Sequence, residues 1–332
     1  MKQFHNILVG VDLFHADPLG STHFRPAADD AIERAIWLAE RQKARLTFFS
    51  AVDIPQSGQY LLEDDRRRVV YHTQKTGEQV MDQLVRRARD RGITAVGRVE
   101  QGRAWVEILR QVLRDCHDLL IVGAADQHVA WRFVLSNTAT RLLHNCPCPV
   151  WVTRPQLKTD GLRVLVASDL SAVSIEALQI GLALGSLADG RVDLLHVIDD
   201  PLASVWSTGL AETSSRRYVE NVRVDAQRVL AEQLARTGDP AAVEVDVHVV
   251  KGSRLPDIAI LDFIDKHRVD LLVIATIARG GAPGVLVGNT AERLLPCLRC
   301  SLLAVKPNDF QCPVTLEAEH QELPSTTGFA DK

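Results

Sequence analysis

The 332-residue sequence lacks any apolar stretch approaching the roughly 18 residues that a membrane-spanning helix needs. We therefore expect no membrane partner. The N-terminal segment does not resemble a secretion signal, because its apolar run is short, ends at Asp12 and has no small-residue cleavage site. The sequence accordingly predicts a cytoplasmic protein.

Cysteine and net charge are also scarce. Six cysteines in so long a chain do not form the disulfide framework of a small secreted domain. The formal net charge is only −4, so no global excess of positive charge favours nucleic acid as a partner. The HExxH motif, the GxSxG elbow and a paired-carboxylate spacing are all missing. Without an identifiable nucleophile or general base, we expect a protein that is not an enzyme.

What the chain does contain is an internal repeat. Residues 136–143 match residues 288–295 at an offset of 152, whereas residues 7–12 match residues 164–169 at an offset of 157. The change in offset predicts two copies of one fold with different loop lengths. Each half, at about 150 residues, is long enough to bury its own core.

Both halves alternate apolar strands with amphipathic helices. In the first half we expect strands near residues 6–12, 45–52, 94–100, 119–124 and 149–153, and helices near 26–42, 62–91, 104–116 and 137–145. In the second half we expect strands near 163–169, 192–198, 242–250, 270–276 and 301–306, and helices near 172–188, 212–236, 254–267 and 289–296. This alternation predicts an α/β fold with two tandem, open, Rossmann-like domains, each a parallel five-stranded sheet flanked by helices. The predicted domains are residues 1–155 and 162–310, followed by a polar tail over residues 311–332.

Ligands of open α/β sheets bind beyond the carboxyl ends of the strands. Asp12 and Asp169 each come at the end of the first predicted strand of their half. A carboxylate at that place can accept hydrogen bonds from a nucleoside. The alternative interpretation is an aspartate that only holds the loop or caps the next helix.

The loop from Ala275 to Asn289 is the second candidate ligand site. It is rich in glycine and enters a predicted helix at Asn289 and Thr290; its glycines are Gly280, Gly281, Gly284 and Gly288. Glycines let backbone N–H groups approach an anion closely, and the start of a helix adds partial positive charge. Arg279 can reach a phosphate. The alternative is a glycine-rich surface loop without a ligand, because neither GxxxxGK[ST] nor GxGxxG is present.

These features together resemble the universal stress protein family. The resemblance covers nearly the whole chain, and the closing segment GNTAERLLPCLRCSLLAVKP is most similar to the E-type tandem members. Members carry a Gly-x2-Gly-x9-Gly-[Ser/Thr] loop for the phosphates of ATP, an Asp after strand one and a Val at the end of strand two. The resemblance implies a stress-response regulator or scaffold that binds ATP, with Mg²⁺ arriving only with the nucleotide, and with protein partners still unknown. The alternatives are a nucleotide-hydrolysing or adenylyl-transfer enzyme of related fold, and a protein-interaction module without a ligand.

The family pattern is better preserved in the second half. There it assigns Asp169 and Val197 to the nucleoside, and the loop positions are Ala275, Ala278, Arg279, Gly281, Gly288, Asn289 and Thr290. Ala275 and Ala278 replace family glycines, at a cost of about 1–2 kcal/mol each wherever the backbone needs positive φ.

The first half departs further from the family pattern. Its matching positions are Asp12, Ala51, Gly123, Asp126, Ser136 and Asn137. Asp126 introduces negative charge where phosphate oxygens would lie, and Trp131 and Phe133 stand where the other half has glycines. We therefore expect the phosphate site of the first half to be lost.

Family members commonly dimerise through their last strands, which implies that a tandem chain makes this contact internally. We expect residues 149–153 to pair antiparallel with residues 301–305, forming an internal pseudo-dimer; the alternative is two independent domains on a flexible linker. This pairing would place Cys148 and Cys300 at opposite ends of the contact, against a shared zinc site. Cys146-x-Cys148 and Cys297-x-x-Cys300 raise the possibility of zinc or redox chemistry. Cys148 and Cys300 hold the same repeat position before a last strand, where the role of a small buried apolar residue fits better. His117 and His196 are expected to be structural.

Overall fold

The computed structural model describes residues 2–13, 24–52, 63–124, 136–155, 159–198, 212–237, 243–252, 255–276 and 289–316. The strands of the first half are β1 (Asn6–Gly10), β2 (Arg45–Val52), β3 (Ala95–Gln101), β4 (Leu119–Gly123) and β5 (Val150–Thr153). Those of the second half are β6 (Arg163–Ala167), β7 (Arg191–Ile198), β8 (Glu244–Lys251), β9 (Leu271–Ala275) and β10 (Ser301–Val305). The α-helices are α1 (Pro26–Gln42), α2 (Glu63–Arg89), α3 (Ala104–Arg114), α4 (Asn137–Asn145), α5 (Ala172–Leu187), α7 (Glu212–Arg236), α8 (Pro256–His267) and α9 (Asn289–Leu294).

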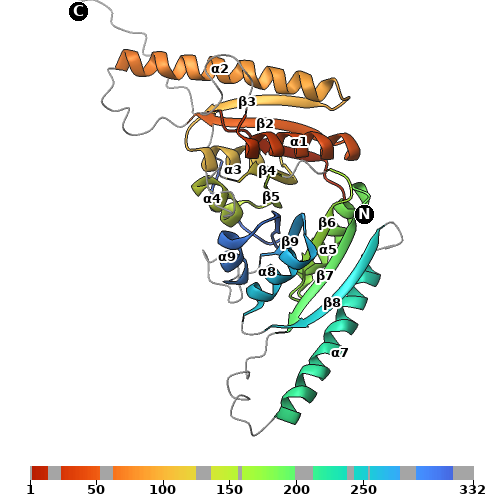
Figure 1. The fold of residues 1–332 in the computed structure, drawn as a ribbon. Helices are drawn as coiled ribbons and strands as arrows, with labels where there is room; N and C mark the ends of the chain where they lie inside the picture. Colours follow the sequence, from red (N-terminus) through yellow and green to blue (C-terminus); the bar gives the residue numbers. More distant parts are fainter. Residues whose placement is uncertain are drawn as a thin grey trace, which may run out of the picture.

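The strands of both halves form one sheet in the order β3-β2-β1-β4-β5-β10-β9-β6-β7-β8 (Figure 1). Neighbouring strands within each half are parallel, as the alternation of strands and helices predicts. The order reads the same from either edge once β6 to β10 are matched with β1 to β5. The two halves are therefore related by a pseudo-two-fold axis.

The contact between the halves is an antiparallel pair of β5 and β10. Trp151 lies opposite Leu303, flanked by the pairs of Val150 with Ala304 and of Val152 with Leu302. The predicted strand contact is confirmed, so the two expected five-stranded sheets are joined into one. The same register places Cys148 and Cys300 at opposite ends of the contact, also as predicted.

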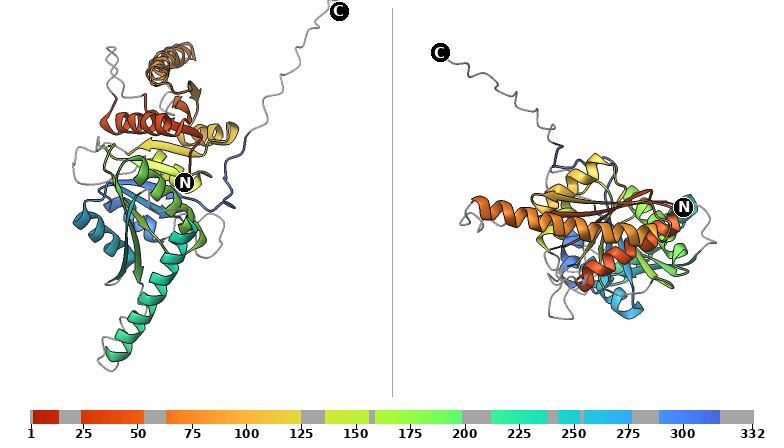
Figure 2. Two further views of the ribbon diagram at one scale, coloured as in Figure 1. Left: turned by 90° about the vertical axis from the view of Figure 1, so that its right-hand side faces the viewer. Right: turned by 90° about the horizontal axis from the view of Figure 1, so that it is seen from above.

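Two layers of helices cover the sheet. Buried side chains of α1, α2, α5 and α7 pack on one face, and those of α3, α4, α8 and α9 pack on the other. The long helices α2 and α7 lie at opposite ends of the molecule (Figure 2). Within the described part of the chain, no helix is long and apolar enough to cross a membrane.

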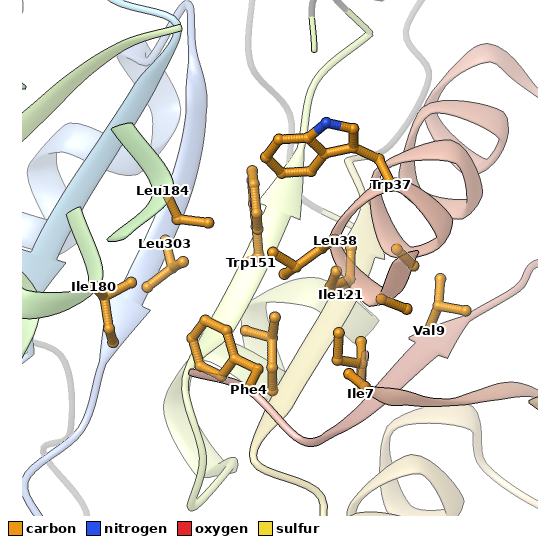
Figure 3. Packing of buried hydrophobic residues seen from close by; sticks show 14 of the residues in the cluster. Phe4, Ile7, Val9, Trp37, Leu38, Ile121, Trp151, Ile180, Leu184 and Leu303 are labelled. Atoms are coloured by element: carbon orange, nitrogen blue, oxygen red, sulfur yellow. The ribbon is translucent and has the colours of Figure 1, made fainter. Parts of the chain in front are cut away.

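The hydrophobic core runs continuously from one half to the other. Phe4 and Trp151 of the first half belong to the same buried cluster as Ile180, Leu184 and Leu303 of the second half (Figure 3). The guanidinium of the buried Arg34 lies 5.7 Å from the centre of a Trp151 ring, which adds a cation–π contact. The halves therefore share a core and are not separate bodies on a linker.

Most elements end close to where the sequence predicts. The clearest differences are β1 and β6, which end at Gly10 and Ala167, two residues earlier than expected. Asp12 and Asp169 consequently lie in loops rather than in strands. The last helix, α9, continues as a 3₁₀ turn over Leu295–Cys297, where Pro296 has no N–H for a regular helical bond.

Candidate functional site

The candidate site of the second half lies where three parallel strands end. Strand β6 is paired with β7 on one side and with β9 on the other, so Ala167 lies beside both Leu195 and Ile274. Parallel strands bring their carboxyl ends to one edge of the sheet. Asp169, Val197 and Ala275, all predicted from the sequence, are therefore brought to the same edge.

The loop after β6 is fastened to the neighbouring elements. The N–H of Ser168 donates to the carbonyl of Leu195 at 2.8 Å, and the Ser168 hydroxyl donates to Gln233 Oε1 of α7 at 3.3 Å. Nδ1 of His196 lies 2.8 Å from the Ser168 carbonyl oxygen, to which it donates its proton. His196 thus has the structural role expected of it.

Asp169 is held in a tight turn. Leu170 adopts the left-handed conformation with φ of 65°, which is uncommon for a residue other than glycine. This turn lets Asp169 Oδ1 accept hydrogen bonds from the N–H of Ser171 at 3.0 Å and from the hydroxyl of Ser174 at 2.5 Å. Asp169 therefore does hold this loop. This role does not exclude a ligand, because an ionised carboxylate can accept several hydrogen bonds.

Val197 is half-buried on the face of the sheet that α8 covers. It lies against Gly252, where an added Cβ would come within 3.1 Å of Val197 Cγ1. The N–H of Gly252 donates to the carbonyl of Ile198 at 3.1 Å, which fixes the exit of β8 beside the end of β7. The site edge is therefore apolar at Val197 and polar at Asp169.

Ala275 is the last residue of β9 and pairs in register with Val305 of β10. Its backbone is that of a regular strand and has no positive φ, so the strain foreseen for an alanine here is absent. The adjacent Thr276 is tied to the Val305 carbonyl through its N–H at 2.8 Å and its hydroxyl at 3.1 Å.

The remaining predicted positions belong to the loop between β9 and α9 and to the start of α9. Ala278, Arg279, Gly281 and Gly288 lie outside the described residues. Asn289 is the first residue of α9, and Thr290, next to it, is half-buried. The structure therefore supports the predicted helix start but does not test the loop that precedes it.

The equivalent edge of the first half is built differently. Asp12 is exposed after β1, and Ala51 is buried near the end of β2. The first turn of α1 packs directly on Gly123, so that a Cβ at this position would come within 2.5 Å of the Ala27 carbonyl oxygen. Gly123 and Ala275 occupy matching places, yet only the second half leaves room there for a side chain.

Ser136 and Asn137 of the first half match Gly288 and Asn289 of the second half. Ser136 caps α4, since its hydroxyl oxygen accepts from the N–H of Ala139 at 3.0 Å, and Asn137 is the first residue of that helix. Asp126, Trp131 and Phe133 lie outside the described residues. The expected loss of the phosphate site in this half stays a prediction.

Three of the four cysteines of the two motifs are buried near the strand contact, whereas Cys297 is exposed. Cys146, Cys148 and Cys300 are buried and none of them is in a disulfide. A hydrogen bond with Cys146 and burial together raise the pKa of Cys148 well above its ordinary value, and burial raises the pKa of Cys300 to about 12. Thiols that stay protonated are poor nucleophiles and poor metal ligands, which favours the apolar role.

Sequence reasoning missed two features of the second half. One is the Leu170 turn with its Ser174 partner, for which the only sequence signal is the serine pair that begins α5. The other is a group formed by Asp193, Asp246 and His248 on the neighbouring strands β7 and β8. No motif signals this group, because its members come together only through strand register.

Comparisons with known proteins agree with this architecture. Residues 3–154 and residues 162–306 each match the model of the universal stress protein family. The chain is 26% identical over 336 residues to universal stress protein E of Salmonella typhi, covering 96% of this chain and 99% of that protein. It is 25% identical over 339 residues to universal stress protein E of Escherichia coli strain K12, covering 97% and 100%.

Solved structures of tandem architecture are similar over the same length. A universal stress protein from Archaeoglobus fulgidus superposes with a TM-score of 0.66 at 17% identity, covering 92% of this chain and 99% of that one. A putative universal stress protein from Pseudomonas aeruginosa UCBPP-PA14 superposes with a TM-score of 0.64 at 19% identity, covering 92% and 94%. At such identities these likenesses bear on the fold.

Proposed function

Both halves of the chain belong to the universal stress protein family, and from this premise we propose a stress-response regulator or scaffold that binds ATP in its second half. The observation that carries the proposal is the edge formed by β6, β7 and β9, where Asp169 and Val197 come together. In the proposed complex Asp169 accepts hydrogen bonds from the nucleoside, and Val197 contacts its apolar surface. The glycine-rich loop and Arg279 would meet the phosphates, and Mg²⁺ arriving with the nucleotide would neutralise part of their charge.

The structure around Asp169 supports a preformed binding site. Its carboxylate is oriented by Ser171 and Ser174, and its loop is tied to β7 through Ser168 and His196. A ligand that meets an already ordered group loses less conformational entropy on binding. Such an arrangement suits recognition of a small molecule.

We propose binding without turnover. In this proposal the hydrogen bonds of Asp169 with Ser171 and Ser174 hold the loop, and His196 Nδ1 donates to a carbonyl, so these residues position the site and do not carry out chemistry. In this proposal the bound nucleotide changes which protein partner the chain engages, and no bond of the nucleotide is broken.

Calorimetric titration of the full chain with ATP, with and without Mg²⁺, tests the proposal. We expect one nucleotide per chain, and we expect Asp169→Ala to weaken binding about ten- to a hundredfold, the worth of a hydrogen bond to a charged group. Asp12→Ala is the matched control in the other half and should bind as the parent does. Equal losses in the two variants would contradict a site confined to the second half.

Two further outcomes would favour the alternatives. No measurable binding by the parent protein would favour a protein-interaction module without a ligand. Steady release of ADP or AMP from ATP, lost in Asp169→Ala, would favour an enzyme. Both outcomes can be read from the same protein preparations.

A further inference from the structure

A polar cluster lies on β7 and β8, closer to the amino ends of these strands than the proposed nucleotide site. Asp193 belongs to β7, Asp246 and His248 belong to β8, and Figure 1 shows these strands next to each other beside α8. Asp193 is opposite Asp246 in the strand register, and His248 lies two residues further along the same strand. One ligand atom from each of the three side chains lies within 4.8 Å of the other two.

Asp193 is a charged group in a buried place, with 1% of its surface exposed. In this buried place its carboxylate is paired with the guanidinium of Arg163 and lies within hydrogen-bond distance of the His248 ring. Arg163 Nε donates to Asp193 Oδ2 at 2.6 Å, and its NH2 group donates to Oδ1 at 3.1 Å. Asp193 is therefore an ionised, oriented carboxylate.

The His248 ring is held with one nitrogen beside Asp193. Its Nε2 lies 2.9 Å from Asp193 Oδ1, and because a carboxylate only accepts, this nitrogen carries the proton. The His248 ring packs edge-on against Phe263 of α8, with ring centres 4.8 Å apart, which limits its rotation. In the other neutral tautomer Nδ1 carries the proton, and the Nε2 lone pair faces Asp193 Oδ1.

The three proposed ligand residues differ in their exposure to solvent. Asp246 is exposed and His248 is half-buried, so the three ligand atoms run from solvent to the interior. The NH2 group of Arg163 also lies 3.0 Å from Nδ1 of His267, and His267 stacks on Phe263 with ring centres 4.1 Å apart. Arg163 thus contacts both Asp193 and His267. It orients the Asp193 carboxylate in the way that an outer-shell residue orients a metal ligand.

The first half shows that the fold does not require this cluster. In matching register positions β2 and β3 carry Thr47 opposite Val96, and Arg98 stands where His248 stands in β8. No carboxylate is present at the first two positions, yet the strands pair in the same way. The three ligand-type side chains are therefore a special property of the second half.

We propose that Asp193, Asp246 and His248 bind a divalent first-row transition ion such as Zn²⁺. Ligand atoms about 2 Å from zinc lie roughly 3–4 Å from one another, a spacing that a small rotation of the exposed Asp246 can reach. The imidazole excludes Mg²⁺ and Ca²⁺ as preferred occupants, since these ions select oxygen ligands. On binding, His248 would take the neutral tautomer that carries its proton on Nδ1, so that Nε2 and Asp193 Oδ1 bond the ion while Arg163 keeps Oδ2. Water completes the coordination.

Zinc titration of the full chain, after removal of metals with a chelator, tests this site. We expect one Zn²⁺ per chain by calorimetry, and at least a tenfold loss of affinity in His248→Gln and in Asp246→Asn. Asp246 is exposed on an edge strand, so Asp246→Asn keeps the test valid even if His248→Gln perturbs folding. Absence of zinc binding by the parent protein, or unchanged affinity in Asp246→Asn, would overturn the proposal.

Matched controls and a spectroscopic measurement separate this site from others. Glu244→Gln removes an exposed carboxylate from the same strand, one that pairs with Arg191 at 2.6 Å, and should leave affinity unchanged. Co²⁺ in place of zinc should give absorption typical of nitrogen and oxygen ligands, and thiolate charge-transfer bands would assign the metal to cysteine and overturn the proposal. Asp169→Ala should keep full zinc affinity, so that failure of nucleotide binding and failure of metal binding can be distinguished.

Discussion

The backbone conformation of Leu170 determines which groups the Asp169 carboxylate can contact. A left-handed conformation costs a non-glycine residue about 1–2 kcal/mol, and here it aims Asp169 Oδ1 at the N–H of Ser171. Leu170 also packs against the buried cluster of α5 and the sheet. Packing of the side chain thus offsets the backbone cost, and the strained residue lies next to the proposed ligand group, where such strain commonly occurs.

The two alanines of the glycine-rich loop are predicted to differ in effect. Ala275 already has strand backbone, so Ala275→Gly should not strengthen ATP binding and should lower the free energy of unfolding by about 0.5–1 kcal/mol. Any gain in the double variant Ala275→Gly/Ala278→Gly should therefore come from Ala278. Calorimetry on both single variants and the double variant checks this, and a gain from Ala275→Gly alone would contradict it.

His117 is predicted to make stability depend on pH. Burial lowers its pKa from the ordinary value of 6.5, even though Nδ1 donates to the Gln111 carbonyl and Nε2 accepts from the Thr47 hydroxyl. The unfolded chain then takes up a proton at higher pH than the native chain. The free energy of unfolding should fall as pH drops below about 6.5, by at most about 1.4 kcal/mol per pH unit for this group.

Urea denaturation at several pH values, compared between the parent and His117→Gln, measures this contribution. The difference between the two curves should change below the ordinary pKa of histidine and level off once the native state is also protonated. Parallel curves for the two proteins over the whole range would show that His117 does not contribute.

At the scale of elements, the β5–β10 pair is the contact on which the arrangement depends. Unpaired, each strand would present a row of backbone donors and acceptors to other chains. Their side chains are buried throughout, and Trp151 lies at the centre of the pair opposite Leu303. Strand β9 lies between β10 and β6 in the sheet. The β5–β10 contact is therefore connected through β9 to the strand that precedes Asp169.

Substitutions at Trp151 should separate packing from hydrogen bonding at this contact. Among the described residues, Trp151 Nε1 is buried without a hydrogen-bond partner. Trp151→Phe removes that group and keeps most of the ring, so it should change the free energy of unfolding by only about 1 kcal/mol. Trp151→Ala leaves a cavity and should cost about 3–5 kcal/mol. Urea denaturation of both variants gives these values, and equal costs would contradict the packing role.

At the scale of the whole molecule, the shared core predicts cooperative unfolding. Both helix layers bury side chains of the two halves in common clusters. Four of the five tryptophans, at positions 37, 105, 131 and 151, lie in the first half, whereas helices of both halves contribute to far-UV circular dichroism. Urea transitions followed by tryptophan fluorescence and by circular dichroism should therefore coincide. Separate midpoints would indicate halves that unfold independently.

At the same scale, the two proposed sites both lie in the second half, at different positions along its strands. The nucleotide edge is formed by the carboxyl ends of β6, β7 and β9, and the metal cluster lies towards the amino ends of β7 and β8. Strand β7 carries both Asp193 and Val197, so it links the two sites directly.

The sequence by itself determined the architecture. Hydrophobic periodicity and the repeat, seen for example in Asp118 and Asp270, placed the strands and helices within a few residues, because these patterns depend on neighbours along the chain. The family resemblance, together with the apolar character of the last strands, predicted the β5–β10 contact. The family pattern in turn named Asp169, Val197 and Ala275, which the sheet does bring to one edge.

The tertiary structure alone decided what these side chains touch. The left-handed turn at Leu170 has only the nearby serines as a local signal, and the close packing of Ala27 on Gly123 and the group of Asp193 with His248 have none. The last two join residues 96 and 55 positions apart, and a shift of one residue in strand register would turn Asp193 to the other face of the sheet. Periodicity therefore predicts which residues form a strand, whereas pairing register and helix packing determine which of them meet.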